Sequence, residues 1–145
     1  MRFYECEGWS EKMGMNYYVD KISLVFKDRN ECYLEEKIDD KLFEFIQKEL
    51  MNKNIERIEA ENMLEMRSIE IFIDDMKFHL GVTDMYNDIN YYMDNLSNDF
   101  TLEEISGNCF EKRFVSNDFC LLWDVFMDFS KTGDVYKNVQ WYMEE

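Results

Sequence analysis

The sequence predicts an α+β domain in which an antiparallel sheet packs against three to five helices. Three observations support this class. Segments 21–36 and 66–82 alternate apolar and polar residues with the period of two that is typical of half-buried strands. Other segments repeat apolar residues every three to four positions, as the buried face of a helix does. Strands and helices do not alternate regularly, which argues against a parallel βαβ sheet.

The N-terminal half supplies a hairpin. Ile22, Leu24 and Phe26 alternate with polar residues, which predicts a strand. Residues 28–30 have the composition of a turn, and 31–36 are predicted to form the second strand.

A helix is expected next, because Asp39 or Asp40 can act as its N-cap. The apolar residues that follow are spaced to form one stripe. They are Leu42, Phe43, Phe45, Ile46 and Leu50. Residues 54–61 are a candidate for a further strand beside the central hairpin.

The central hairpin has the clearest pattern in the chain. Residues 69–73 form an unbroken β-type run, and Asp74-Asp75 follows as a turn. After the turn, Met76, Phe78 and Leu80 are expected on one face of the second strand. Lys77 and His79 are expected on the other face.

Three more helices are expected in the C-terminal half. Thr83 or Asp84 can cap the first, which would run to residue 96. Residues 101–104, Thr-Leu-Glu-Glu, fit a capping box and predict a short helix that ends at Gly107. Asn117 or Asp118 can cap an apolar helix that runs through Phe129 and ends at Gly133. Residues 134–143 fit either a helix or a strand.

Length and composition indicate one globular domain, residues 1–145. The chain has 46% hydrophobic and 17% aromatic residues, which excludes intrinsic disorder, and no linker divides it. There is neither an apolar run long enough to span a membrane nor a signal-peptide pattern, so we expect a cytoplasmic protein. The four cysteines are far apart in sequence and are expected to be free, buried thiols.

The charge excludes several kinds of partner. Asp and Glu total 32 against 16 Lys and Arg, a net charge of −16. Direct binding to nucleic acid requires Lys and Arg to neutralise phosphates, and an anionic membrane attracts basic segments. Neither partner fits this chain. Most of the charge lies in residues 54–145, and the 34 residues between Lys77 and Lys112 contain no Lys or Arg.

The acidic residues of this half are predicted to bind a partner. Asp84 with Asp88, and Asp124 with Asp128, stand four residues apart, so each pair would share a helix face about 5–6 Å apart. Such spacing resembles that of successive phosphates on a nucleic-acid strand, and nearby aromatic residues could anchor an interface. The predicted partner-binding residues are Asp84, Asp88, Tyr91, Asp94, Asp99, Glu103, Glu104, Asp124 and Asp128.

Catalytic motifs are absent, and no metal or cofactor is predicted. His79 is the only histidine, and no ligand spacing surrounds it. Asp75-Met76-Lys77 matches half of the acid-x-Lys pattern of magnesium-dependent nucleases, but the turn position and the lack of a basic track argue against that activity. A small cytoplasmic enzyme or ligand-binding domain using His79 or the Asp74/Asp75 pair is an alternative, as is a subunit of a larger assembly.

This profile resembles two groups of small acidic inhibitor proteins. They are the immunity proteins of bacterial toxin systems and the phage anti-defence proteins that imitate nucleic acid, including anti-CRISPR proteins. The resemblance rests on composition and aromatic content and not on a family motif. It implies a non-catalytic inhibitor that binds a basic effector, such as a nuclease toxin, and occupies its substrate site.

Overall fold

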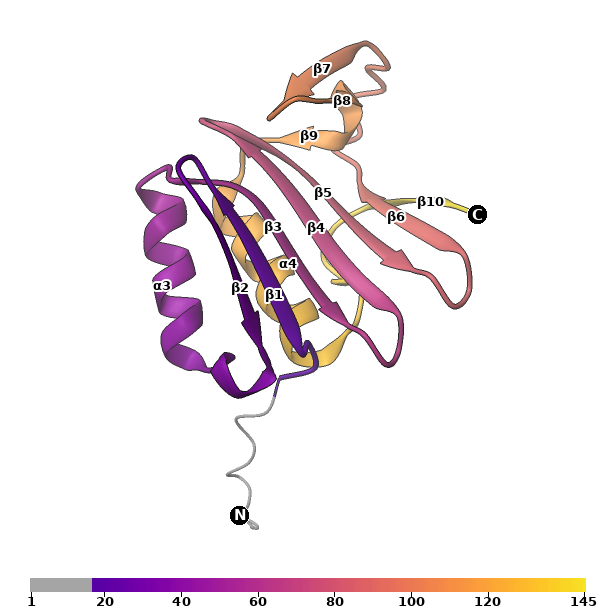
Figure 1. Cartoon of the computed structure of the whole chain (residues 1–145). Helices are drawn as coiled ribbons and strands as arrows, with labels where there is room; N and C mark the ends of the chain where they lie inside the picture. Colours follow the sequence, from indigo (N-terminus) through magenta and orange to yellow (C-terminus); the bar gives the residue numbers. More distant parts are fainter. Residues whose placement is uncertain (1–16) are drawn as a thin grey trace.

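The computed structural model describes residues 17–145 of the chain, and an antiparallel sheet is its framework (Figure 1). The strand order across the sheet is β10-β6-β5-β4-β3-β1-β2, and β9 pairs with β5 beside this path. The strands are β1 (Lys21–Phe26), β2 (Asn30–Leu34), β3 (Ile55–Asn62), β4 (Arg67–Asp74), β5 (Lys77–Asp84), β6 (Ile89–Met93), β9 (Val115–Ser116) and β10 (Trp141–Glu144). A separate hairpin contains β7 (Leu102–Ile105) and β8 (Asn108–Glu111). The 3-10 turns η1 (Glu35–Lys37) and η2 (Lys112–Phe114) follow β2 and β8.

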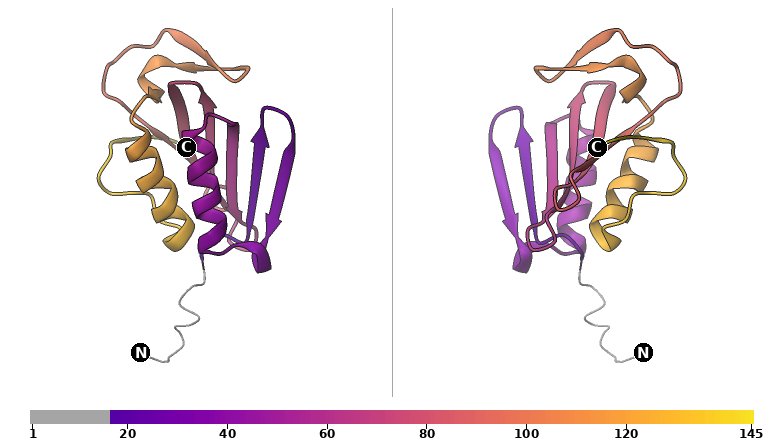
Figure 2. Two further views of the ribbon diagram at one scale, coloured as in Figure 1. Left: turned by 90° about the vertical axis from the view of Figure 1, so that its left-hand side faces the viewer. Right: turned by 90° about the vertical axis from the view of Figure 1, so that its right-hand side faces the viewer.

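Two α-helices cover one face of this sheet and leave the other face open (Figure 2). The helices are α3 (Asp40–Met51) and α4 (Phe119–Thr132). As predicted, aspartates cap both helices: Asp39 accepts the N–H of Leu42 at 2.9 Å, and Asp118 accepts that of Leu121 at 3.1 Å. These bonds satisfy N–H groups that lack partners within the helix.

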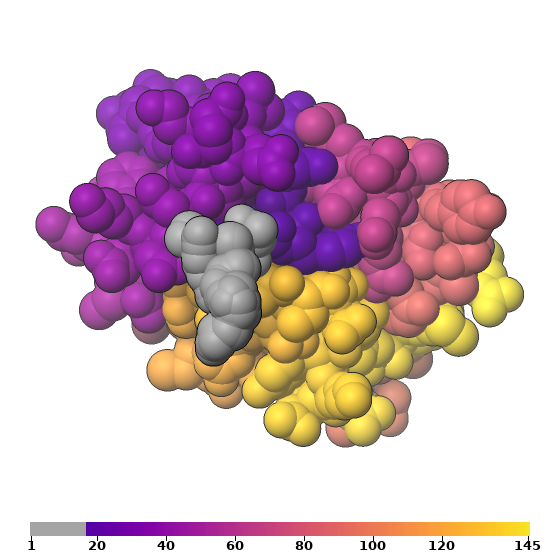
Figure 3. All heavy atoms as spheres, turned by 90° about the horizontal axis from the view of Figure 1, so that it is seen from below, coloured from indigo at the N-terminus to yellow at the C-terminus, as the bar shows by residue number. Residues whose placement is uncertain are grey.

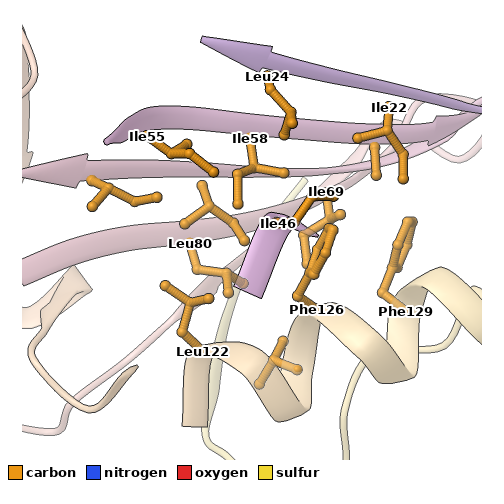
Figure 4. Packing of buried hydrophobic residues seen from close by; sticks show 14 of the residues in the cluster. Ile22, Leu24, Ile46, Ile55, Ile58, Ile69, Leu80, Leu122, Phe126 and Phe129 are labelled. Carbon is orange, nitrogen blue, oxygen red and sulfur yellow. The ribbon is translucent and has the colours of Figure 1, made fainter. Parts of the chain in front are cut away.

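The core lies between the sheet and the two helices (Figure 4). Every second residue of the central strands points into it, and the apolar stripes of α3 and α4 meet them. Fully buried members from the strands are Ile22, Leu24, Ile58, Ile69, Ile71, Phe78 and Leu80, and those from the helices are Ile46, Leu122, Phe126 and Phe129. Close packing of these side chains fixes which face of each strand turns inward.

The start of the described chain is tied to the end of α4. The backbone N–H of Tyr18 donates to the carbonyl of Ser130 at 2.8 Å. Gly133 ends α4 with φ +78°, and a Cβ there would lie 2.6 Å from Cζ of Tyr18. Gly133 is therefore required both by its backbone conformation and by the aromatic ring against it. Figure 3 shows this end of the molecule, where indigo residues meet orange and yellow ones.

The predicted packing of a sheet against three to five helices is wrong. The structure is mostly antiparallel sheet, with ten strands and 42% of residues in strands, and it contains only two α-helices in the described residues. Segments 21–36 and 66–82 do form the hairpins β1–β2 and β4–β5, and 54–61 lies in β3. The surplus helices were predicted in the C-terminal half.

The segment predicted as a helix from residue 84 to residue 96 is a hairpin and a loop. Asp84 ends β5, and β6 pairs with both β5 and β10. Asp88 has φ +58°, which interrupts any helix at that point. The apolar spacing in this segment fits a helix, but pairing with two neighbouring strands satisfies the same backbone groups and buries Met93.

The segment predicted as a helix by the capping box is also a hairpin, β7–β8. Ser106 and Gly107 form its two-residue turn, with φ of 47° and 85°. Positive φ at both positions is typical of the turn that best matches the twist of two strands. Gly107 therefore makes a hairpin turn and does not end a helix. The open choice for residues 134–143 is settled for the end of that segment, because β10 begins at Trp141.

No helix in residues 17–145 has the length and apolar character needed to cross a bilayer.

Candidate functional site

The open face of the sheet is the face opposite α3 and α4, and it is the face toward the viewer in Figure 1. Residues paired across neighbouring strands point to the same face, so the register places each side chain. The central row runs from Glu59 on β3 through Glu70, Gly81 and Tyr92 to Tyr142 on β10. Beside it, Arg57 pairs with Phe72 and Phe72 with His79. This face therefore combines carboxylates with aromatic rings.

A hollow of about 320 Å³ lies on this face around Gly81, and we call it the Gly81 hollow. It is lined by Glu70, Phe72, His79, Gly81, Thr83, Asn90, Tyr92, Asn108 and Phe110. Gly81 sits between Glu70 and Tyr92 in the central row and has no side chain to fill the space. A Cβ at this position would lie 3.2 Å from Cδ1 of Tyr92. Glycine inside a strand often marks close approach by a ligand.

His79 forms one wall of the Gly81 hollow. Its side chain is buried, and its ring stacks on Phe110 with centroids 3.8 Å apart and planes 10° from parallel. Nδ1 lies 2.9 Å from the carbonyl oxygen of Phe114, which can only accept, so Nδ1 carries the ring proton. Burial lowers the pKa of His79 to about 4, and the bond to Phe114 opposes this shift. At neutral pH the ring is uncharged, with Nε2 as a hydrogen-bond acceptor.

Two carboxylates face each other across β3 and β4 beside the hollow. Glu59 and Glu70 are directly opposed in register, and Arg57 contacts Glu70 and lies 3.9 Å from Glu59. Desolvation raises the pKa of Glu59, and the charge of Glu70 raises it further. Like charges directly opposite each other destabilise a sheet. Arg57 serves both carboxylates, and near Glu59 the positive charge of Lys21 opposes the negative charge of Glu61, so one negative charge is in excess.

The β7–β8 hairpin covers one end of the open face. Phe110 on β8 packs on both Phe72 and His79, and Glu103 on β7 forms an ion pair with Lys77 on β5. The hydroxyl of Ser106 donates to the carbonyl of Ile73. The hairpin therefore closes one side of the hollow and accounts for the burial of His79.

Asp84, Asp88 and Tyr91 lie near the β5–β6 turn. Asp84 is buried, lies 3.3 Å from Arg67, and accepts hydrogen bonds from the backbone N–H and side-chain amide of Asn87. The bond from the Asn87 side chain makes the largest contribution to lowering the pKa of Asp84. Asp88 is exposed in the turn, whereas Tyr91 packs against the core. The carboxylate of Asp84 is thus engaged by contacts within the protein.

Asp94, Asp99, Glu103 and Glu104 lie along the connection from β6 into β7. Asp94 accepts the N–H of Leu96, and Asp99 accepts both the N–H and the hydroxyl of Thr101. Glu103 is paired with Lys77, and Glu104 is exposed. Lys77 and Asp84 stand at opposite ends of β5, about 23 Å apart at roughly 3.3 Å per residue. Glu103 is therefore remote from Asp84.

Asp124 and Asp128 do share a helix, as predicted, but α4 lies on the covered side of the sheet. Asp124 lines a separate, largely apolar cavity of about 480 Å³ between the ends of the two helices. Asp75 lines the same cavity and lies 3.2 Å from Lys53. His79 and Asp75 therefore line different cavities. The nine predicted residues do not form one surface, and a binding role for any of them stays a prediction.

Sequence reasoning missed the residues that build the Gly81 hollow. Glu70, Gly81, Tyr92 and Phe110 come from four different strands, so no local motif joins them. One signal was available, because Gly81 interrupts a predicted strand and an isolated glycine in a strand pattern indicates close backbone approach. The acid pair could be found only after the β3–β4 register was known.

Possible metal ligands and thiols are scattered over residues 17–145. These residues contain no group of three or more His, Cys, Asp or Glu side chains arranged to hold a metal ion. Cys32, Cys109 and Cys120 are free and exposed, so their expected burial is wrong, while Cys6 lies outside the described residues. Comparisons of the chain with protein-family models, curated proteins and solved structures find no match.

Proposed function

We propose that this protein is a non-catalytic inhibitor that binds a basic protein effector, such as a nuclease or toxin, through the open face of its sheet. The observation that carries the proposal is the opposed Glu59–Glu70 pair on the sheet face that neither α3 nor α4 covers. The fold tolerates an excess negative charge at this point, and a cationic partner would use it. The net charge of −16 supports the same partner chemistry.

The composition of the open face also supports protein binding. Its acids Glu59, Glu61, Glu70, Asp74 and Glu144 outnumber its bases Lys21, Arg57 and Lys77. Tyr92 and Tyr142 stand among them with stacked rings, 6.4 Å between centroids. Aromatic side chains within a charged rim are typical of interface anchors. The face therefore offers both steering charge and apolar contact.

The test compares two variants that each lose two negative charges. Wild-type protein is used as bait in an extract of its native host, and the activity of the retained basic protein is measured with and without the inhibitor. We expect inhibition by wild type and by D124N/D128N, with slower association and weaker inhibition for E59Q/E70Q. Equal inhibition by all three proteins, or no inhibited partner, would overturn the proposal.

A subunit of a larger assembly is the second candidate, and one apolar patch favours it. The β3–β4 and β5–β6 turns lie side by side, since the N–H of Met85 donates to the carbonyl of Met66. Leu64 and Tyr86 on these turns are 90% and 80% exposed. If this patch mediates assembly, L64E should convert an oligomer to a monomer in sedimentation experiments. A monomeric wild type contradicts this candidate.

The enzyme alternative that uses His79 or Asp75 has less support. The two side chains line different cavities and so do not act together, and a histidine with a pKa of about 4 is a weak base. Asp75 forms an ion pair with Lys53 at 3.2 Å.

A further inference from the structure

We propose that the Gly81 hollow receives the guanidinium group of an arginine side chain on the basic partner. This inference rests on the proposed function for the identity of the partner, but the hollow itself can be tested without it. Four features argue for a flat, hydrogen-donating cation: free acceptors, ring faces, net charge and an open floor.

The free polar atoms around the hollow are mostly acceptors. Nε2 of His79 has no hydrogen-bond partner among the described residues, although His79 is only 5% exposed to solvent. Glu70 uses Oε2 for Arg57 and leaves Oε1 without a partner in the same part of the chain. Asn108 donates from Nδ2 to Ser106, so its Oδ1 is available. Guanidinium has five N–H donors and no acceptor, and it matches this set.

Aromatic rings line the same space. Phe110 stacks on His79, and the ring of Tyr92 lies 5.7 Å from His79 between centroids. Phe72 completes this group, 5.2 Å from Phe110. Arginine binds the faces of such rings more readily than lysine does, because its planar group is weakly hydrated. An internal case lies beside the hollow, where Arg57 sits 5.0 Å above the ring of Phe72 and contacts Glu70.

The charge of the lining favours a cation. Among residues 17–145, Glu70 is the only charged side chain that lines the hollow at neutral pH, because the burial of His79 keeps its ring neutral. A protonated imidazole would repel a guanidinium and remove the acceptor at Nε2. Arg57 is shared between Glu59 and Glu70, and the nearby charges of Lys21 and Glu61 oppose each other, so one negative charge remains in excess beside the hollow.

Gly81 forms the floor of the hollow without adding a side chain to it. Gly81 does not have the positive φ that would require glycine, since only Gly107 and Gly133 do among the described glycines. Its place in the middle of β5 is costly, because glycine is unfavourable inside a strand. Because Gly81 has no side chain, the Tyr92 ring lies close over its backbone, with Cδ1 3.2 Å and Cε1 3.6 Å from where a Cβ would stand, and the floor of the hollow stays low between Glu70 and this ring. A cavity of about 320 Å³ suits one side chain and not a large ligand.

The experiment titrates the isolated protein with Nα-acetyl-arginine methylamide and follows amide and aromatic NMR signals. We expect saturable shifts at His79, Gly81, Tyr92 and Phe110, with a dissociation constant in the millimolar range. The matched probe is the citrulline analogue, which has the same shape without the charge and should bind at least tenfold more weakly. Equal binding of both probes, or no shift at these residues, overturns the proposal.

Two variants test the named groups. G81A places a methyl group on the floor 3.2 Å from the Tyr92 ring and should abolish the arginine response, and E70Q should weaken it at least fivefold. S68A, on the same face beside Glu70, is the control that should bind as wild type does. Amide spectra establish that each variant is folded. A response to arginine that G81A and E70Q leave unchanged contradicts the assignment.

The outcomes separate this inference from the proposed function. If a basic partner is inhibited by wild type and by G81A equally, the inhibitor proposal stands and the arginine site is wrong. If the blocked arginine binds but no inhibited partner exists, the site stands as a cation site and the inhibitor proposal is wrong. Much tighter binding of free L-arginine than of the blocked form would assign the hollow to the free amino acid and overturn the partner assignment.

Discussion

The two faces of the sheet differ in the kinds of residue that they carry. The covered face is almost entirely aliphatic and aromatic, with Ile22, Ile58, Ile69 and Leu80 fully buried beneath the helices. The open face carries a glycine in mid-strand, two opposed carboxylates and the single histidine of the chain. Packing explains the first set of residues completely. The second set costs stability, which is what is expected where function selects the residues.

The largest expected effect is on the free energy of unfolding, when one aromatic residue on each side of the sheet is truncated to alanine. Phe126 on α4 is fully buried, whereas Tyr142 on the open face is 36% exposed. F126A should lower the free energy of unfolding by roughly 3–5 kcal/mol, since it removes buried surface and leaves a cavity. Y142A should cost about 1 kcal/mol or less. Denaturant unfolding measures both, and equal losses would contradict the distinction drawn here.

The pH dependence of stability should reveal His79. The pKa falls from the ordinary 6.5 to about 4 in the folded state, so below pH 6.5 the unfolded chain binds a proton that the folded chain does not. The stabilising contribution is therefore present above pH 6.5 and is lost as the pH falls toward 4, by about 3 kcal/mol in full.

The matched variant for this prediction is H79N, which keeps a donor for Phe114 but does not titrate. Comparing its unfolding free energy with that of wild type from pH 8 to pH 4 isolates the histidine from the carboxylates. Parallel curves for the two proteins would show that His79 titrates alike in both states.

The β7–β8 hairpin should set the pKa of His79. Phe110 covers the imidazole from this hairpin, and desolvation is the main cause of the low pKa. F110A should expose the ring and move its pKa from about 4 toward 6.5, as an NMR titration of the ring protons would show. F119A, which alters an aromatic contact with Phe78 on the covered side, is the control and should leave the pKa near 4.

The smallest effect concerns the opposed carboxylates. E59Q should raise the free energy of unfolding at neutral pH by roughly 0.2–1 kcal/mol, because it removes a like charge facing Glu70. Since the pKa of Glu59 is raised in the folded state, wild type should regain this stability as the pH falls through that pKa, and the advantage of the variant should vanish. A less stable variant at pH 7 would show that the pair is not repulsive.

Local sequence patterns correctly predicted the elements that have one buried face and one polar face. The β4–β5 hairpin follows from alternation alone, and the two helices follow from an aspartate cap with an apolar stripe behind it. The prediction for residues 84–107 was wrong because their apolar spacing fits a helix, whereas pairing with other strands decides their conformation. Tyr92 illustrates this, since it pairs with Gly81 on one side and with Tyr142 on the other.

By itself the sequence determined the charge, the two helices, the two main hairpins and the apolar faces that these elements bury, because these depend on composition and short-range periodicity. Tertiary structure decided which acids lie together. Glu59 and Glu70 lie opposite each other across β3 and β4, whereas Asp84 forms an ion pair with Arg67 and accepts a hydrogen bond from Asn87. Sheet register is a long-range property that is fixed when the buried faces pack. The residues that line the Gly81 hollow are therefore brought together by the register, and no local sequence pattern predicts them.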